Sequence, residues 1–323
     1  MLPCLPLFLC AGLAVVPASP TADALAVAKA SGKIKLWNSV RPRARQVANW
    51  ELSLFFPQRD DGDMQTQMGL RTQADQDRTL KAVAAISIGG VASASLLEGA
   101  TALPPTLRYG LSAAAMLAPF AVLAAGVALP DELRRLLVAL WRLDPRYRKR
   151  QIYHEAGHFL VGLLVGLQMD GYNIHGDGAA VQVSTPDPVS WVGACGQAYD
   201  QSPREAADAL LDALLVLSMA GVAAEVLACG DAEGGIADVA QARAFMQRIA
   251  PNARAGQPSR ARARVVEDDR IRWATLMALT LLQRHRSSLD AVVEVFEASG
   301  TVGAAMNAAE AAAPADDARR QSS

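Results

Sequence analysis

Two apolar stretches without charged residues occupy the first half of the chain. Residues 82–97 are 16 uncharged residues rich in Ala, Gly and Ser, and residues 109–130 are 22 uncharged residues including Pro119. A transmembrane helix needs about 20 apolar residues, so the second stretch is long enough and the first is short. The pattern predicts a membrane helical hairpin at residues 81–130, or a single span at residues 109–130. A buried hairpin of a large helical core is the alternative.

The polar and apolar positions after residue 148 predict a mainly α-helical domain with a small β element. Residues 179–184 alternate enough for a short strand. Ser202, Pro203 and Glu205 form a helix start, with a capping hydroxyl, a proline at the first helical position and a glutamate that closes a capping box. This helix is expected to end at Gly230.

Three more helices and a loop are expected in the rest of this half. A further helix is expected to begin near Gly235, and residues 251–266 are expected to form a basic, flexible loop. Residues 269–286 and 289–298 predict two closing helices. Residues 301–323, which end in a low-complexity run of Ala, Asp and Ser, are expected to be mostly disordered.

The first 80 residues differ from the rest in charge. Residues 1–50 carry six Lys or Arg and one acid, Asp23, after an apolar start. A basic, acid-poor leader resembles an organelle transit peptide, whereas the apolar run resembles a secretory signal without its leading positive charge. We expect residues 1–50 to be a leader that is removed or disordered, and residues 51–80 to be a polar linker.

Composition and charge narrow the function classes. The chain of 323 residues is 51% hydrophobic, 20% charged and 5% aromatic, and its Ala and Leu content favours helices over sheet. A net charge of -1, with no basic stretch interleaved with aromatics, argues against a nucleic-acid partner. The four cysteines form no CxxC pair and are expected to be reduced. Cys195 and Cys229 are possible metal ligands, but small buried residues are the simpler interpretation.

The charge of the residues after the predicted hairpin indicates its orientation in the membrane. Residues 131–150 hold seven basic residues and three acids. Basic flanks mark the side of a membrane to which a chain is not translocated. The domain that follows is therefore expected on the cytosolic or stromal side.

Residues 151–167, QIYHEAGHFLVGLLVGL, contain an H-E-x-x-H pattern within an apolar helix. His154 and His158 are four residues apart, so they project from one helix face and can chelate one zinc ion. Glu155 would lie beside the open coordination position, where it can accept a proton from water. A chance match on a core helix is the alternative, but two unpaired imidazoles and a carboxylate would be costly to bury without a metal.

The third protein ligand is not set by the motif. A catalytic zinc site has three protein ligands and keeps the fourth position for water. An extended H-E-x-x-H-x-x-G-x-x-H pattern is excluded, because Val161 and Leu164 stand at its last two fixed positions. The residues therefore leave two possibilities, a distant carboxylate or His175.

The segment Met219–Gln241, MAGVAAEVLACGDAEGGIADVAQ, resembles the FtsH-type membrane zinc proteases when it is taken together with HEAGH. In that family an AG-x-AAE helix follows the HEAGH helix, and a G-x-x-x-D-[LIV] turn supplies an aspartate ligand. The resemblance covers residues 148–300. It implies a Zn²⁺ cofactor and the following roles: His154, His158 and Asp238 as ligands, Glu155 as catalytic base, and Glu225 as the competing third ligand.

One departure from the family concerns the motor. FtsH proteases carry an AAA ATPase domain, and this sequence contains no G-x-x-x-x-G-K-[ST] motif. The arrangement resembles the small stand-alone FtsH-like proteins of plant and algal plastids, in which EGG-[LI]-x-D and R-W-x-x-L recur, here Glu233–Asp238 and Arg272–Leu276. This implies a chloroplast membrane, thylakoid or envelope, with the peptidase domain facing the stroma. It also implies a homo-oligomer, or a hetero-oligomer with an FtsH-type ATPase complex.

Two functions from different classes follow. The first is a membrane-anchored zinc endopeptidase that hydrolyses unfolded or membrane-associated polypeptides. The second is a non-proteolytic zinc-site protein that binds or assembles membrane partners. The lack of a nucleotide-binding motor favours the second, whereas an intact Glu155 favours the first, because a purely structural site needs no base.

Overall fold

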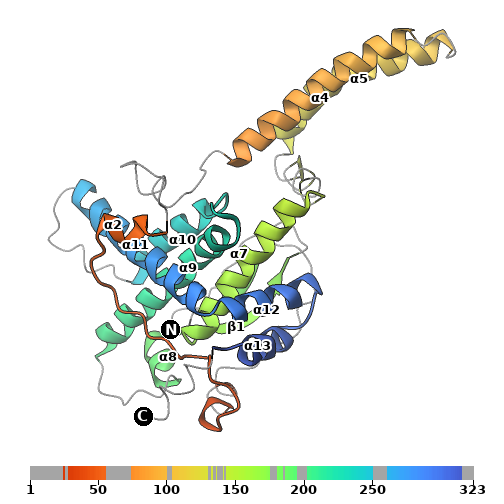
Figure 1. The fold of residues 1–323 in the computed structure, drawn as a ribbon. Coiled ribbons are helices and arrows are strands. Elements are labelled where there is room, and N and C mark those ends of the chain that lie inside the picture. The colour runs from red at the N-terminus through yellow and green to blue at the C-terminus, as the bar shows by residue number, and fades with distance from the viewer. Residues whose placement is uncertain are drawn as a thin grey trace. The chain divides into compact units, whose positions relative to one another are not determined.

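The structure is a computed structural model, and its described residues are mainly helical (Figure 1). It describes Leu25 and residues 28–55, 74–99, 104–129, 132–133, 136, 141, 143–174, 180–184, 186–194, 202–249 and 260–314. The chain divides into two compact units, Thr72–Arg148 on one hand and Met1–Arg71 with Lys149–Ser323 on the other. The elements in chain order are α2 (Asn49–Ser53), α4 (Ala74–Gly99), α5 (Pro105–Ala128), α7 (Pro145–Leu164), β1 (Gln168–Asn173), β2 (Ala180–Ser184), α8 (Pro188–Ala194), α9 (Pro203–Cys229), α10 (Ile236–Ile249), α11 (Arg260–Arg284), α12 (Arg286–Glu297) and α13 (Val302–Ala311).

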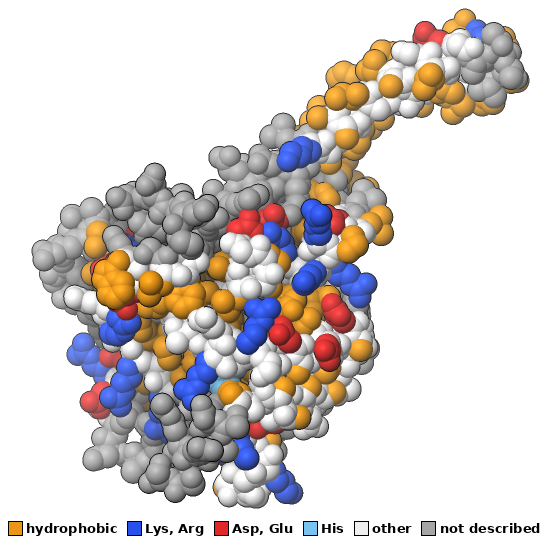
Figure 2. All heavy atoms as spheres, in the orientation of Figure 1, with side chains coloured by type: hydrophobic (Ala, Val, Ile, Leu, Met, Phe, Trp, Pro, Cys, Tyr) orange, Lys and Arg blue, Asp and Glu red, His pale blue; other side chains and the backbone are white. Residues whose placement is uncertain are grey.

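In the smaller unit, α4 and α5 pack against each other through small residues. A Cβ on Gly90 would lie 2.5 Å from the Ala115 carbonyl oxygen, so the two backbones nearly touch there. The buried Ser112 Oγ donates to the Ala94 carbonyl oxygen at 3.3 Å. Large apolar side chains such as Phe120 point outward instead, and Figure 2 shows apolar side chains in orange along the visible face. Small residues at the contact and large apolar residues outside are typical of membrane helix pairs.

Three described helices are long and apolar enough to cross a membrane: Lys81–Gly99 within α4, Pro105–Ala128 and Pro203–Cys229. In α4 and α5, only 6% of the most apolar 18-residue stretch of each helix is buried. In α9, 94% of the corresponding stretch is buried within the protein. We therefore assign α9 to the core of the larger unit. The predicted pair of helices at residues 81–130 is confirmed, and its insertion into a membrane stays a prediction.

The core of the larger unit forms where α7 and α9 cross. Gly157 makes the close approach, because a Cβ there would lie 2.6 Å from the Ala220 carbonyl oxygen. α9 is apolar on nearly every side along its central turns, and the last turns of α7, from Phe159 to Leu164, are also apolar and buried. α9 also contacts α8, α10 and α11, so it is the central helix of this unit.

Both predicted ends of α9 are confirmed. Ser202 Oγ accepts a hydrogen bond from the Glu205 N–H, and Glu205 Oε2 accepts one from the Ser202 N–H at 2.8 Å. Gly230 ends the helix with φ 85°, a left-handed conformation that glycine adopts without steric cost. The turn that follows leads into α10, whose first turn carries Asp238.

A two-stranded antiparallel sheet follows α7. The strand predicted at residues 179–184 is confirmed as β2, which pairs with β1. β1 was not predicted, because its sequence QMDGYN contains Asp, Gly and Asn, which are disfavoured in strands. The register shifts between Met169 and Gly171, so one extra residue interrupts the alternation that would have indicated a strand.

Residues 28–47, which we call the N-terminal strap, are ordered, and this corrects the expectation of disorder for that part of the chain. The strap packs on the larger unit with Leu36 and Trp37 almost completely buried. Its backbone binds α7, because the Asn38 N–H donates to the Leu163 carbonyl oxygen at 2.9 Å. It also binds α13, because the Lys35 and Leu36 N–H groups donate to the Glu310 carboxylate. A segment that supplies core side chains and hydrogen bonds is not disordered, and the removal of residues 1–50 stays a prediction.

Other boundaries also need correction. The expected linker at residues 51–80 includes the end of α2 and the start of α4, while residues 56–73 lie outside the described residues. α11 begins at Arg260, inside the expected loop at residues 251–266.

The tail expected at residues 301–323 is likewise corrected, because it contains α13. Thr301 caps this helix by accepting a hydrogen bond from the Ala304 N–H, and its apolar face is buried. The buried residues of that face recur at helical intervals: Val302, Ala305, Met306 and Ala309. α12 and α13 contact each other, and α13 contacts β1 (Figure 1).

Candidate metal centre

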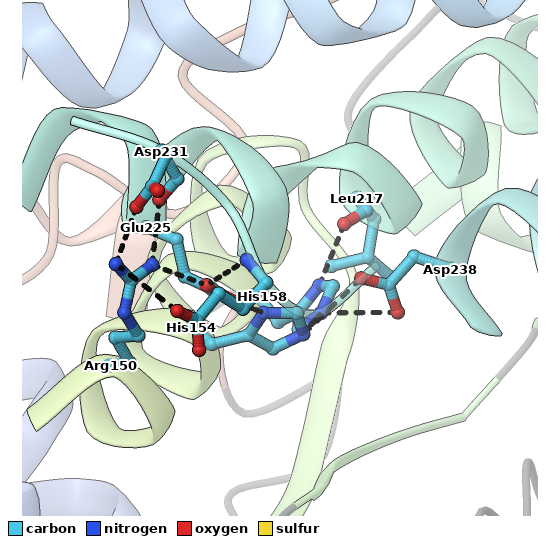
Figure 3. Close-up of polar contacts among 8 residues, drawn as sticks. Arg150, His154, His158, Leu217, Glu225, Asp231 and Asp238 are labelled. Carbon is cyan, nitrogen blue, oxygen red and sulfur yellow. Dashed lines mark hydrogen bonds and ion pairs between the residues drawn. The ribbon is translucent and has the colours of Figure 1, made fainter. Parts of the chain in front are cut away.

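α7 presents the two histidines of the motif on one face. Figure 3 shows the His154 and His158 rings side by side, with their Nε2 atoms 3.1 Å apart. Gly221 of α9 makes room for the first ring, because a Cβ at that position would lie 2.4 Å from His154 Nε2. The close crossing of α7 and α9 therefore holds one imidazole directly against a glycine backbone.

α10 presents Asp238 to the same point from its first turn. The buried carboxylate places Oδ2 3.2 Å from His154 Nε2 and Oδ1 3.7 Å from His158 Nε2. The ligand atoms of these three residues all lie within 4.8 Å of one another, a group that could hold a metal ion. Residues 80 positions apart in the sequence thus meet at one site.

The spacing of the three donors fits a small tetrahedral ion. Zinc binds nitrogen and oxygen at about 2.0–2.1 Å, which places two tetrahedral ligands roughly 3.3 Å apart. The two Nε2 atoms are 3.1 Å apart, and Asp238 Oδ2 lies 3.2 Å from His154 Nε2, both close to that value. The 3.7 Å contact with His158 Nε2 is made by the other carboxylate oxygen, Oδ1. Asp238 Oδ2 is also buried, and its polar neighbour is His154 Nε2, the atom with which it would share a cation.

The other nitrogen of each imidazole fixes its tautomer. His158 Nδ1 lies 2.8 Å from the Leu217 carbonyl oxygen, and His154 Nδ1 lies 2.8 Å from Glu225 Oε1. A carbonyl and a carboxylate only accept hydrogen bonds, so both Nδ1 atoms carry the proton. Both Nε2 atoms then offer their lone pairs to the shared point, which is the arrangement of histidine ligands in metal sites.

The charges around this point are strongly coupled. Burial lowers the pKa of His154, but Asp238 and Glu225 outweigh burial and raise it well above its usual value. Burial raises the pKa of Asp238, but His154 and His158 outweigh it and the net shift is downward. Both shifts mean that the carboxylates favour positive charge at this point, which a divalent cation could supply.

Glu155 lies beside this group and is almost completely buried. Burial raises its pKa above the usual value for a glutamate, although the two histidines oppose the shift. The Val181 N–H of β2 donates to Glu155 Oε2 at 2.8 Å, which leaves Oε1 as the other possible proton acceptor. A carboxyl group with a raised pKa is suited to proton transfer near neutral pH.

The alternative ligands lie elsewhere or have another role. Glu225 touches the far nitrogen of His154 and does not belong to the three-residue group. Its pKa is lowered, because hydrogen bonding and charge from His154 outweigh burial. The partly buried Cys229 is a free thiol outside the group, while His175 and Cys195 lie outside the described residues.

The sequence did not point to the polar network behind the ligands. Arg150, one helical turn before His154, reaches Glu225, Asp231 and Glu233. None of these contacts follows from the spacing of the H-E-x-x-H pattern. The sequence offered only the three acids of Asp231–Asp238 and the basic start of α7, and such charge runs are usually solvated.

Comparison of this chain with protein-family models, with curated proteins and with solved structures finds no match.

Proposed function

We propose that this protein is a membrane-anchored zinc endopeptidase. The observation that carries the proposal is the meeting of His154 Nε2, His158 Nε2 and Asp238 beside the buried Glu155. Three protein donors and an adjacent carboxylate are what a hydrolytic zinc site requires of the protein. The resemblance to FtsH-type proteases supports the same roles for these residues.

The chemistry divides between the metal and the chain. A bound zinc ion would supply Lewis acidity toward a peptide carbonyl and toward water. In this proposal Glu155 takes a proton from water at its other carboxylate oxygen, Oε1, and returns it to the leaving amine. His154 and His158 keep their orientation through the Nδ1 hydrogen bonds to Glu225 and to the Leu217 carbonyl oxygen.

The proposed substrates are extended or unfolded polypeptides, including membrane-associated ones. These 323 residues contain no P-loop to power unfolding, so the chain itself supplies no such work. The apolar exterior of α4 and α5 supports anchorage in a membrane. A chloroplast membrane and association with an FtsH-type ATPase complex are part of the proposal through the resemblance alone.

The test is hydrolysis of an unfolded casein-like substrate by the full chain in detergent or vesicles, with bound zinc measured on the same sample. We expect cleavage that added ATP does not change and that a chelator abolishes. Glu155→Gln keeps the size of the side chain and is not a ligand, so zinc should remain while cleavage falls by about 10²–10⁴. Wild-type protein that carries zinc and cleaves nothing unfolded would refute the peptidase proposal.

One observation favours a second function. Glu155 is buried, and one of its oxygens already accepts the Val181 N–H, so access to water requires the remaining oxygen or a movement of β2. A zinc-site protein that binds or assembles membrane partners without proteolysis needs no such access. Full zinc occupancy without hydrolysis, in the experiment above, would favour this function.

A further inference from the structure

Arg150 is the centre of an ion-pair network behind the candidate metal centre. Its Nη1 donates to the Asp231 carbonyl oxygen at 2.9 Å and lies 3.4 Å from Glu225 Oε2. Its Nη2 donates to Asp231 Oδ1 through a short contact and lies 3.8 Å from Glu233 Oε1. Figure 3 shows the guanidinium between α7 and the turn after α9, on the far side of His154 from Asp238.

The turn that Arg150 holds is the one that delivers Asp238. It runs from Gly230 to Gly235, and both of these glycines have positive φ, at 85° and 98°. The Glu233 N–H donates to Glu225 Oε2 at 2.9 Å, so the turn is anchored at a second point. Its packing is tight, because a Cβ on Gly234 would lie 2.8 Å from Glu225 Oε1.

We infer that Arg150 is a positioning residue that sets the place of the third metal ligand relative to the first two. It sits on the same helix as His154 and His158, and it grips the backbone and side chain of the turn that leads to Asp238. It acts on His154 as well, through Glu225, which contacts both residues. This inference rests on the proposed metal site.

The chemistry of the contacts requires an arginine. A guanidinium is planar and offers five donors in a fixed fork, so it can hold a carbonyl and two or more carboxylates at once. A lysine in its place would keep the charge but would offer a single point of contact. The side chains involved are largely shielded from water, with 18% of Arg150 and 14% of Asp231 exposed, so the pair is screened less than a surface pair.

The experiment compares metal binding by full chains in detergent, without any assay of hydrolysis. Zinc affinity is measured by competition with a chelator, and ligand geometry is measured by the visible spectrum of bound Co²⁺. We expect Arg150→Gln to weaken zinc binding by about 10–100-fold, as loss of an outer partner does in known sites. We also expect its Co²⁺ spectrum to change and Arg150→Lys to restore binding only in part.

Two further variants control for a general loss of structure. Arg243→Gln on α10 removes an ion pair with Asp268, at 2.9 Å, from the helix that carries Asp238, and it should leave zinc affinity and the spectrum unchanged. Asp231→Asn weakens the same ion pair by removing the charge of the partner of Arg150. Because Arg150 and Asp231 act as one contact, the double variant should lose little more than either single variant.

The outcomes separate the inference from the proposal beneath it. Wild-type protein that binds no zinc would remove both. Wild-type binding with an unchanged affinity and spectrum in Arg150→Gln would overturn the positioning role and leave the metal site standing. If Arg150→Gln does not fold, additive losses in Arg150→Lys and Asp231→Asn would overturn the role, and coupled losses would support it.

Discussion

Replacing Gly221 by alanine tests how helix packing shapes the candidate metal centre. The new Cβ would lie 2.4 Å from His154 Nε2, 2.5 Å from Cε1 and 2.6 Å from Cδ2. Carbon contacts are normally about 3.5–4.0 Å, so the ring or the α9 backbone must move by about 1 Å. Metal–ligand distances tolerate only about 0.2 Å, so the movement removes His154 from the ligand set. We expect zinc affinity to fall by at least about 100-fold, the upper end of the cost of losing an outer partner.

The assay separates this effect from unfolding. Alanine is favoured over glycine within a helix by about 0.5–1 kcal/mol, so the metal-free variant should keep its helices. Zinc at 100 times its dissociation constant should stabilise the wild type by about 2.7 kcal/mol, seen as a higher melting temperature, and should stabilise the variant far less. Gly303→Ala on α13 is the matched control, because its nearest neighbour, Thr301 Oγ1, lies 3.9 Å away. Wild-type zinc affinity in Gly221→Ala would refute the reasoning.

Four further outcomes are expected. Asp238→Ala should bring bound zinc, measured by metal analysis, near background, whereas Glu225→Ala should weaken zinc binding only about 10–100-fold. Full zinc occupancy in Asp238→Ala would exclude Asp238 as a ligand. Zinc affinity should fall as the pH drops, because protons compete with zinc for His154. Burial lowers the pKa of His154, but the neighbouring carboxylates outweigh burial and raise it, so this competition should begin above pH about 6.5. A zinc affinity that does not change with pH would contradict this. Trp37→Ala should destabilise the larger unit by about 3–5 kcal/mol in thermal melts, since its side chain is buried in the core. The chain should resist carbonate extraction from membranes until residues 80–130 are deleted, and release of the intact chain would place the hairpin in a soluble core.

Local patterns predicted the elements that are determined locally. The Ser202–Glu205 capping box and Gly230 gave both ends of α9, because each acts within one turn of helix. The length of the apolar runs predicted α4 and α5. The two histidines of the candidate site followed from their spacing alone. Asp238 came from the resemblance, and the structure brings it to the same point.

The features that sequence reasoning missed depend on contacts between distant segments. The N-terminal strap resembled a leader because it is basic, but Glu310 and the end of α7 bind its backbone. β1 has no strand pattern of its own and forms by pairing with β2. The same applies to Arg150, whose partners lie 75 to 83 positions later in the chain. No local periodicity carries information about such pairings.

The geometry of the candidate metal centre therefore depends on helix packing as much as on the motif. An H-E-x-x-H helix fixes only the separation of two imidazoles, and the third donor must reach them from another helix. Here the position of α9 determines how far the third donor lies from the two imidazoles. Gly157 of α7 lets the α9 backbone come close, and Gly221 of α9 leaves space for the His154 ring. The turn after α9 then determines where α10 begins. Gly157 and Gly221 at the helix crossing, and the ion pairs of Arg150 with the turn, both affect the position of Asp238 relative to His154. Substitutions at either place should therefore change metal affinity before they change the fold.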